Sequence, residues 1–173
     1  MNRFMSFTCA GLLLALTTFA SATAQQVVDT DLKAKHGDWS IRCVKSNQDA
    51  CVMTQEGLNA KGDPVLRVSF QRTKNVKDPK GNIVPAAMNI AAPLGVFLPT
   101  GLTAKIDGAD AGAAHFKFCD QQACRIEELV SEKFITNLKK GSNLVMIIHA
   151  RDGSRADINL SLTGFTKAFG SLK

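Results

Sequence analysis

Four of the five cysteines form two closely spaced pairs, Cys43 with Cys51 and Cys119 with Cys124. Polar residues typical of turns separate the members of each pair. Four thiols allow three pairings, and in an exported chain the short spacing predicts the disulfides Cys43–Cys51 and Cys119–Cys124. Closing such short loops stabilises the folded chain by roughly 2 to 3 kcal/mol each. The pattern therefore favours β-hairpins that are each held by one disulfide.

The first 24 residues have the pattern of a cleaved export signal. Arg3 precedes an apolar run over residues 10–19, and Ala22-Thr23-Ala24 matches a small-x-small cleavage site. The run is too short to cross a hydrocarbon core of about 30 Å, which argues against the alternative of an uncleaved anchor. The sequence thus predicts one exported domain over residues 25–173, located in the periplasm, on the outer-membrane surface or outside the cell. Cys9, the fifth cysteine, would be removed with the signal.

The chain is basic, with a formal net charge of +6 that becomes +5 when Arg3 is removed. An exported basic domain meets anionic lipids, polysaccharides or acidic proteins, although the charge can also serve solubility alone. A candidate basic binding patch consists of Lys61, Arg67, Arg72, Lys74, Lys77 and Lys80. These side chains bind an anionic partner only if they share a face, and the alternative is an ordinary solvated loop. One Trp and no Tyr leave few aromatic groups for stacking bases, so nucleic acid is not expected as a partner.

Alternation of apolar and polar residues predicts strands over 39–44, 65–72, 144–150 and 156–163. Residues 131–140 predict a short helix, because Ser131 can cap it, Lys139 and Lys140 suit its C-terminus and Gly141 can end it. Many short strands with one or two short helices predict an all-β fold, an antiparallel β-sandwich.

Three further segments carry weaker patterns. Residues 25–35 are polar and are expected to be frayed. Residues 84–102 contain three prolines among apolar residues, which predicts short edge strands or irregular crossings with Leu94, Val96 and Leu98 in the core. Residues 109–114 have the composition of a small-residue linker.

No motif predicts a catalytic, metal or cofactor site. The cysteine pairs lack the two-residue spacing of thiol oxidoreductases, and His36, His115 and His149 have no ligand spacing for zinc. Glu127 and Glu128 are adjacent in a predicted strand and so point to opposite faces. A catalytic site assembled from distant loops stays open as an alternative.

Several blocks of residues resemble one family. The first block is Gly37-Asp38-Trp39, followed by the first cysteine pair and Met53. The second is Pro93-Leu94-Gly95-Val96, followed by Pro99 and Gly101. The last two are Phe118 with the second cysteine pair, and Ser161-Leu162 followed by Gly164-Phe165. In this order they resemble the invasion-associated locus B (IalB) family over residues 36–169. The resemblance implies an exported protein of Gram-negative bacteria with an immunoglobulin-like β-sandwich, linked in some pathogens with host-cell invasion, and no catalytic residues.

These observations favour a non-enzymatic, disulfide-stabilised binding module that contacts an envelope or host component. The alternatives are an envelope enzyme with a site assembled from loops and a thiol oxidoreductase.

Overall fold

The structure, a computed structural model, describes residues 28–173. The predicted export signal, residues 1–24, lies outside the described residues. The elements follow in the order β1 (Thr30–His36), β2 (Trp39–Val44), β3 (Asn47–Leu58), β4 (Pro64–Arg72), β5 (Ala86–Ala92), the 3-10 helix η1 (Leu98–Thr100), β6 (Leu102–Ile106), β7 (Ala109–Ala114), β8 (Phe118–Cys119), β9 (Cys124–Val130), α1 (Glu132–Lys140), β10 (Asn143–His149), β11 (Arg155–Ser161) and α2 (Phe165–Ser171).

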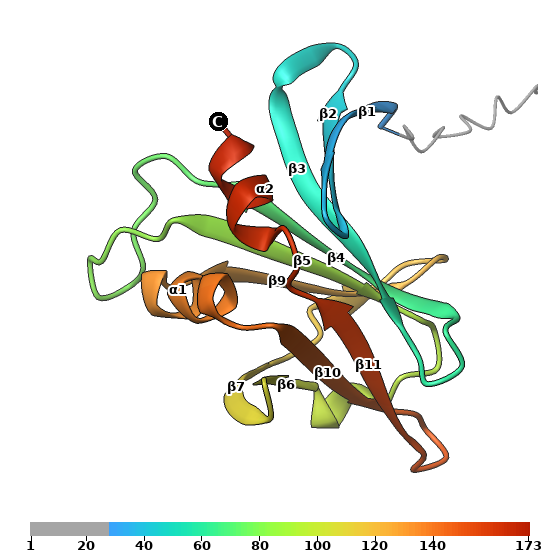
Figure 1. Cartoon of the computed structure of the whole chain (residues 1–173). Helices are drawn as coiled ribbons and strands as arrows, with labels where there is room; N and C mark the ends of the chain where they lie inside the picture. Colours follow the sequence, from blue (N-terminus) through green and yellow to red (C-terminus); the bar gives the residue numbers. More distant parts are fainter. Residues whose placement is uncertain (1–27) are drawn as a thin grey trace, which may run out of the picture.

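The strands pair antiparallel throughout and form two layers (Figure 1). One layer has the order β1–β2–β3–β4–β5–β9–β8, and the other has the order β7–β6–β10–β11. The long strand β3 links them, because its first half pairs with β2 and its last residue, Leu58, pairs with Asn159 of β11. The predicted antiparallel β-sandwich with two short helices is therefore confirmed.

The core lies between the two layers and consists of alternate side chains of β2, β3, β4, β5, β6, β9, β10 and β11. Val68 and Ile90 of one layer are fully buried, as are Met146 and Ile158 of the other. These inward residues belong to a single hydrophobic cluster that also includes residues of both helices. The alternation visible in the sequence thus marks the faces that the layers bury against each other.

Helix α1 confirms the predicted helix over 131–140. The Ser131 side chain accepts a hydrogen bond from the Phe134 N–H, and Ile135 and Leu138 are buried. Gly141 ends the helix with an ordinary φ of −77°. A Cβ at this position would lie 2.5 Å from Cγ2 of Ile106, so the glycine is required for space and not for a left-handed turn.

Helix α2 lies across one end of the sandwich (Figure 1). Four aromatic side chains pack together there. The Trp39 ring lies 5.2 Å from Phe165 and 5.8 Å from Phe70, and Phe165 stacks on Phe169 at 5.9 Å. The Trp39 Nε1–H donates to the carbonyl of Ser161 at 3.0 Å. The start of β2 is thereby fixed to the end of β11 and to the C-terminal helix.

Three expectations from the sequence are wrong. Residues 86–92 are not edge strands but the interior strand β5, which pairs with β4 and β9. Pro85 and Pro93 lie just outside this strand, where they interrupt no ladder. Residues 109–114 form β7 instead of a linker, and residues 30–36 form β1 instead of a frayed end.

The loop after β5 also differs from its expected place in the core. Leu94 and Leu98 are exposed, as is Phe97, while Val96 is half-buried. The loop is held by backbone bonds, because the Phe97 N–H donates to the His149 carbonyl at 2.7 Å and Val96 forms a bridge with Ala150. The apparent alternation here arises in an irregular segment and not in a strand.

We predict that Gly164→Ala destabilises the protein by roughly 3 kcal/mol or more. Gly164 has a φ of +85°, and a Cβ there would lie 2.1 Å from the His36 carbonyl oxygen. Gly153→Ala is the matched control, because Gly153 has a φ of +83° with nothing within 4 Å of its Cβ position. Gly153→Ala is expected to lower the free energy of unfolding by about 1 kcal/mol, from backbone strain alone. Urea denaturation of both variants measures the difference, and equal costs would contradict the close contact.

Candidate functional site

The structure separates the predicted basic patch into two groups. Lys61 lies in the turn before β4, whereas Lys74 follows the end of that nine-residue strand. A strand of this length spans about 30 Å. Lys77 and Lys80 lie on the β4–β5 connection, which projects from the body of the molecule (Figure 1). The six residues therefore do not form one surface.

The two arginines of the predicted patch lie on opposite faces of β4. Arg67 points outward and pairs with Glu56 at 2.7 Å, so its charge is locally balanced. Arg72 points toward the closed end of the core, where its guanidinium lies 4.8 Å from the centroid of the Phe169 ring. Its Nε–H donates to the Phe169 carbonyl at 3.4 Å. The two arginines lie on opposite faces because they are an odd number of residues apart, and successive side chains of a strand point to opposite faces.

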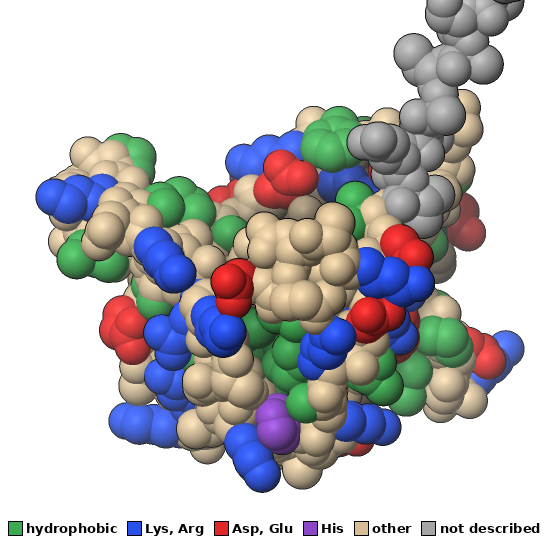
Figure 2. Space-filling model, turned by 90° about the horizontal axis from the view of Figure 1, so that it is seen from above, with side chains coloured by type: hydrophobic (Ala, Val, Ile, Leu, Met, Phe, Trp, Pro, Cys, Tyr) green, Lys and Arg blue, Asp and Glu red, His purple; other side chains and the backbone are tan. Residues whose placement is uncertain are grey.

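A different group of cations gathers where the helices close the sandwich. We define the helical-end basic surface as Arg72, Lys74, Lys139, Lys167 and Lys173, which come from β4 and the segment after it, α1, α2 and the C-terminus. Figure 2 looks down on this end and shows Lys and Arg side chains along the side that carries α1 and α2, with few acidic side chains among them.

The ring of Phe169 organises part of this surface. The ammonium group of Lys139 lies 5.2 Å from the ring centroid, and Arg72 approaches the same ring. Thr166 Oγ1–H donates to the Lys139 carbonyl at 3.3 Å, which joins the end of α1 to the start of α2. Cations over an aromatic face are attracted by its quadrupole, so two positive charges are held close together here.

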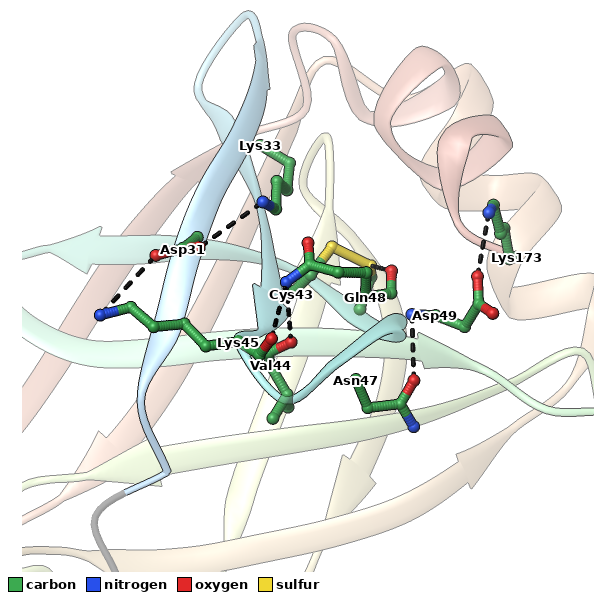
Figure 3. Close-up of a disulfide and its surroundings, with 10 residues drawn as sticks. Asp31, Lys33, Cys43, Val44, Lys45, Asn47, Gln48, Asp49 and Lys173 are labelled. Carbon is green, nitrogen blue, oxygen red and sulfur yellow. Dashed lines mark hydrogen bonds and ion pairs between the residues drawn. A yellow bond between two sulfur atoms is a disulfide. The ribbon is translucent and has the colours of Figure 1, made fainter.

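The tip of the β2–β3 hairpin adds an acidic residue that is already bound to lysine (Figure 3). Lys173 Nζ donates to Asp49 Oδ1 at 2.9 Å, and this ion pair lowers the pKa of Asp49. The charge of Lys74 lowers the pKa further. One carboxylate thus sits among five cations, and the surface keeps a net positive charge.

The first disulfide, Cys43–Cys51, joins β2 to β3 behind this hairpin tip (Figure 3). The two cysteines are direct partners in the strand register, with their Cα atoms 4.0 Å apart. Cys43 is buried and belongs to the core cluster. The bond therefore fixes the pairing of β2 with β3 at the edge of the core.

The second disulfide, Cys119–Cys124, joins β8 to β9 around a turn that Asp120 organises. The Asp120 carboxylate accepts hydrogen bonds from the N–H groups of Gln122 and Ala123 and from Arg125 Nε–H. These donors lower the pKa of Asp120, the backbone groups most strongly. Both disulfides lie in hairpins, away from the helix N-terminus that activates the thiols of oxidoreductases.

The remaining candidate groups are dispersed. His36 is in β1, His115 follows β7 and His149 ends β10. Across residues 28–173, no group of three or more His, Cys, Asp or Glu side chains is placed to hold a metal ion. Glu127 and Glu128 point to opposite faces of β9, and Lys117 pairs with Glu128 at 3.2 Å.

A hollow on the outward face of the larger layer was not predicted from the sequence. It measures about 880 Å³ and lies on the outward face of β1 to β4, with Asn159 and Ser161 of β11 at its border. Its walls are about equally polar and apolar, and charged side chains such as Lys35, Asp38 and Arg42 contribute to them. The sequence shows the polar residues on the outward face of each alternating strand. It does not show the strand register that brings these residues together.

The fold and the two disulfides define the chain as a small, disulfide-stabilised β-sandwich protein. The sequence profile of the Invasion associated locus B (IalB) protein family matches residues 39–173, and the chain belongs to this family. It is 28% identical over 165 residues to the Invasion protein B homologs of Brucella abortus strain 2308 and of biovar 1 strain 9-941, covering 93% of this chain and 89% of each relative.

A solved structure shares the fold. The crystal structure of invasion associated protein b from Bartonella henselae matches with a TM-score of 0.64 and 21% identity, over 82% of this chain and 96% of that chain. In the described range, neither helix is long and apolar enough to span a bilayer.

We predict that replacing both cysteines of a pair by alanine costs about 2 to 3 kcal/mol of stability for either disulfide. Cys43→Ala with Cys51→Ala should cost more than Cys119→Ala with Cys124→Ala, because Cys43 belongs to the core cluster and Cys51 packs against it, whereas Cys124, although equally buried, lies outside the cluster and Cys119 is exposed. Urea denaturation of the two double variants gives the comparison. A larger loss from the second pair would contradict the structural ranking.

We predict a pH-dependent role for Asp120. Because folding lowers its pKa, the ionised carboxylate stabilises the fold above the unfolded-state value of about 3.9, and this contribution is lost as pH falls through the folded pKa. Asp120→Asn keeps an acceptor for the turn but removes the charge. The urea midpoint of Asp120→Asn should lie below that of the unaltered protein at neutral pH, and the two midpoints should converge as the pH falls through the folded pKa of Asp120. A constant difference across the range would contradict this.

Proposed function

We propose that the protein is an exported, non-enzymatic binding module of the cell envelope, which contacts a phosphate-bearing anionic surface through the helical-end basic surface. The observation that carries the proposal is the gathering of Arg72, Lys74, Lys139, Lys167 and Lys173 around one end of a rigid sandwich. Arg72 and Lys74 belong to the basic patch predicted from the sequence. Lys61 and Arg67 lie elsewhere and have no part in this surface.

Export is supported by the signal pattern and by two disulfides, which persist in oxidising compartments. The names of the Brucella relatives associate them with invasion. A protein that acts in the envelope and a protein that acts in invasion both contact the surface of a membrane. For this chain we propose that contact alone. The periplasm, the outer-membrane surface and the medium beyond it are all compatible with that step.

The spread of the five cations favours an extended anionic surface over a single small anion as the partner. The five cations are spread over four segments, and each is exposed or lies against Phe169 and not in an enclosed cavity. A juxtaposed anionic membrane attracts each Lys or Arg by about 1 kcal/mol, and the attraction weakens with salt. The attractions of several separate cations can act at the same time only if the anionic partner is large enough to reach all of them.

We predict that the unaltered protein sediments with vesicles containing phosphatidylglycerol and not with pure phosphatidylcholine vesicles, and that added salt releases it. The triple variant Lys74→Glu, Lys139→Glu, Lys167→Glu should bind about a hundredfold more weakly or worse, because each reversal removes about 1 kcal/mol of attraction. The triple variant Lys33→Glu, Lys61→Glu, Lys105→Glu changes the net charge equally and should retain most of the binding.

Two outcomes would contradict the proposal. An equal loss in both triple variants would mean that net charge alone drives binding, and no loss in the first would place binding on another surface. A second series with lipopolysaccharide aggregates identifies which phosphate-bearing surface is preferred. Competition by soluble polyphosphate shows whether phosphate groups are sufficient.

A further inference from the structure

One row of side chains crosses the outward face of the larger layer without interruption. The strand register aligns Lys35 with Ser40, Ser40 with Thr54, Thr54 with Ser69, Ser69 with Asn89, and Asn89 with Glu127. The row thus passes over β1, β2, β3, β4, β5 and β9. Its length is about 24 Å, because neighbouring strands lie about 4.8 Å apart.

The middle of this row is the floor of a trough. Ser40, Thr54, Ser69 and Asn89 are short polar side chains, and all four are half-buried although they point outward. Two hollows, of about 880 Å³ and about 390 Å³, lie along the row and share Val52 and Ser69. The floor carries hydroxyl and amide groups, with Ser69 Oγ–H donating to Thr54 Oγ1 at 3.2 Å.

The two ends of the trough carry opposite charge. Lys35 and Arg42 at the β1–β2 end have no acidic partner within 4.0 Å among residues 28–173, and Asp38 is the one carboxylate that lines this end. Glu127 at the β9 end accepts a hydrogen bond from Asn89 Nδ2–H at 3.3 Å and has no cationic partner in the same range.

The charges in the next row of the same outward face, where Arg67 and Arg125 flank Ala91, are already neutralised. Arg67 pairs with Glu56 at 2.7 Å, and Arg125 pairs with Asp120 at 3.0 Å. Uncompensated charge therefore lies at the two ends of the trough, positive over β1 and β2 and negative over β9. A ligand that matches this pattern has an acidic end and a basic end about 24 Å apart.

We propose that this trough binds an extended polypeptide segment whose acidic end lies over Lys35 and Arg42 and whose basic end lies over Glu127. About seven residues of extended chain span the distance. The hydroxyl and amide groups of the floor can exchange hydrogen bonds with the peptide backbone of such a segment. An oligosaccharide fits less well, because Phe70, the one aromatic residue among those that line the two hollows, is fully buried and offers no exposed ring for stacking, and because a neutral sugar leaves both charged ends unused.

The proposal is tested by titrating the isotope-labelled protein with two blocked heptapeptides of equal composition. The first, Glu-Glu-Glu-Gly-Lys-Lys-Lys, separates its charges, and the second, Glu-Lys-Glu-Gly-Lys-Glu-Lys, alternates them. The first should bind about fivefold more tightly, because exposed ion pairs at both ends contribute modestly. Its amide shift changes should follow the row from Lys35 to Glu127.

Two variants make the test specific. Ser69→Trp fills the floor and should weaken binding of the first peptide by about tenfold or more, as loss of the hydrogen-bonding floor and steric exclusion act together. Thr103→Trp, on the exposed face of β6 in the other layer, is the matched control and should leave binding unchanged. Lys35→Glu makes both ends acidic and should abolish the preference for separated charges.

Three results would overturn the proposal. They are equal affinity for the two peptides, shift changes on a face other than the trough, and retention of the preference in Lys35→Glu. Maltoheptaose is the neutral comparison ligand. If it shifts the row where the peptides do not, the trough is an oligosaccharide site and the polypeptide assignment is wrong.

Discussion

The contact between Trp39 and the C-terminal helix is the interaction on which the remaining structure depends. Trp39 is fully buried, packs against Phe70 and Phe165, and donates its indole N–H to Ser161. Aromatic pairs of this kind contribute about 0.5–1.5 kcal/mol beyond their buried area. Gly37 and Gly164 allow the two backbones to meet near Trp39, since a Cβ at Gly37 would collide with the Thr163 carbonyl and a Cβ at Gly164 with the His36 carbonyl.

This closure also decides where the surface charges lie. Because Phe165 and Phe169 enter the end of the core, α2 is held against β4 and α1, and Arg72 and Lys139 reach the same aromatic ring. The helices occupy the end of the sandwich and leave the outward face of the larger layer open. The helical-end basic surface and the trough are therefore separate surfaces, one made by helix packing and the other by strand register.

Much of the fold could be predicted where local chemistry and tertiary packing agree. The strand beginning at Trp39, the cysteine hairpins and helix α1 each carry a periodicity or cap that a short segment determines. The wrong predictions concern segments whose structure depends on the strands that pair with them. β5 is an interior strand because β4 and β9 supply partners on both sides, and β7 is a strand because β6 pairs with its small residues. The composition of an isolated segment contains neither fact.

The sequence by itself determined the class of fold, the membership of the IalB family and the two cysteine pairs, because alternation, motif order and short spacing are local properties. It did not determine which charges act together. Six basic residues within one stretch of sequence lie on different sides of β4, whereas Arg72 of β4 and Lys139 of α1 reach the ring of Phe169 in α2. Only the tertiary structure decides such groupings, because strand register and helix packing set the distances between residues far apart in the chain.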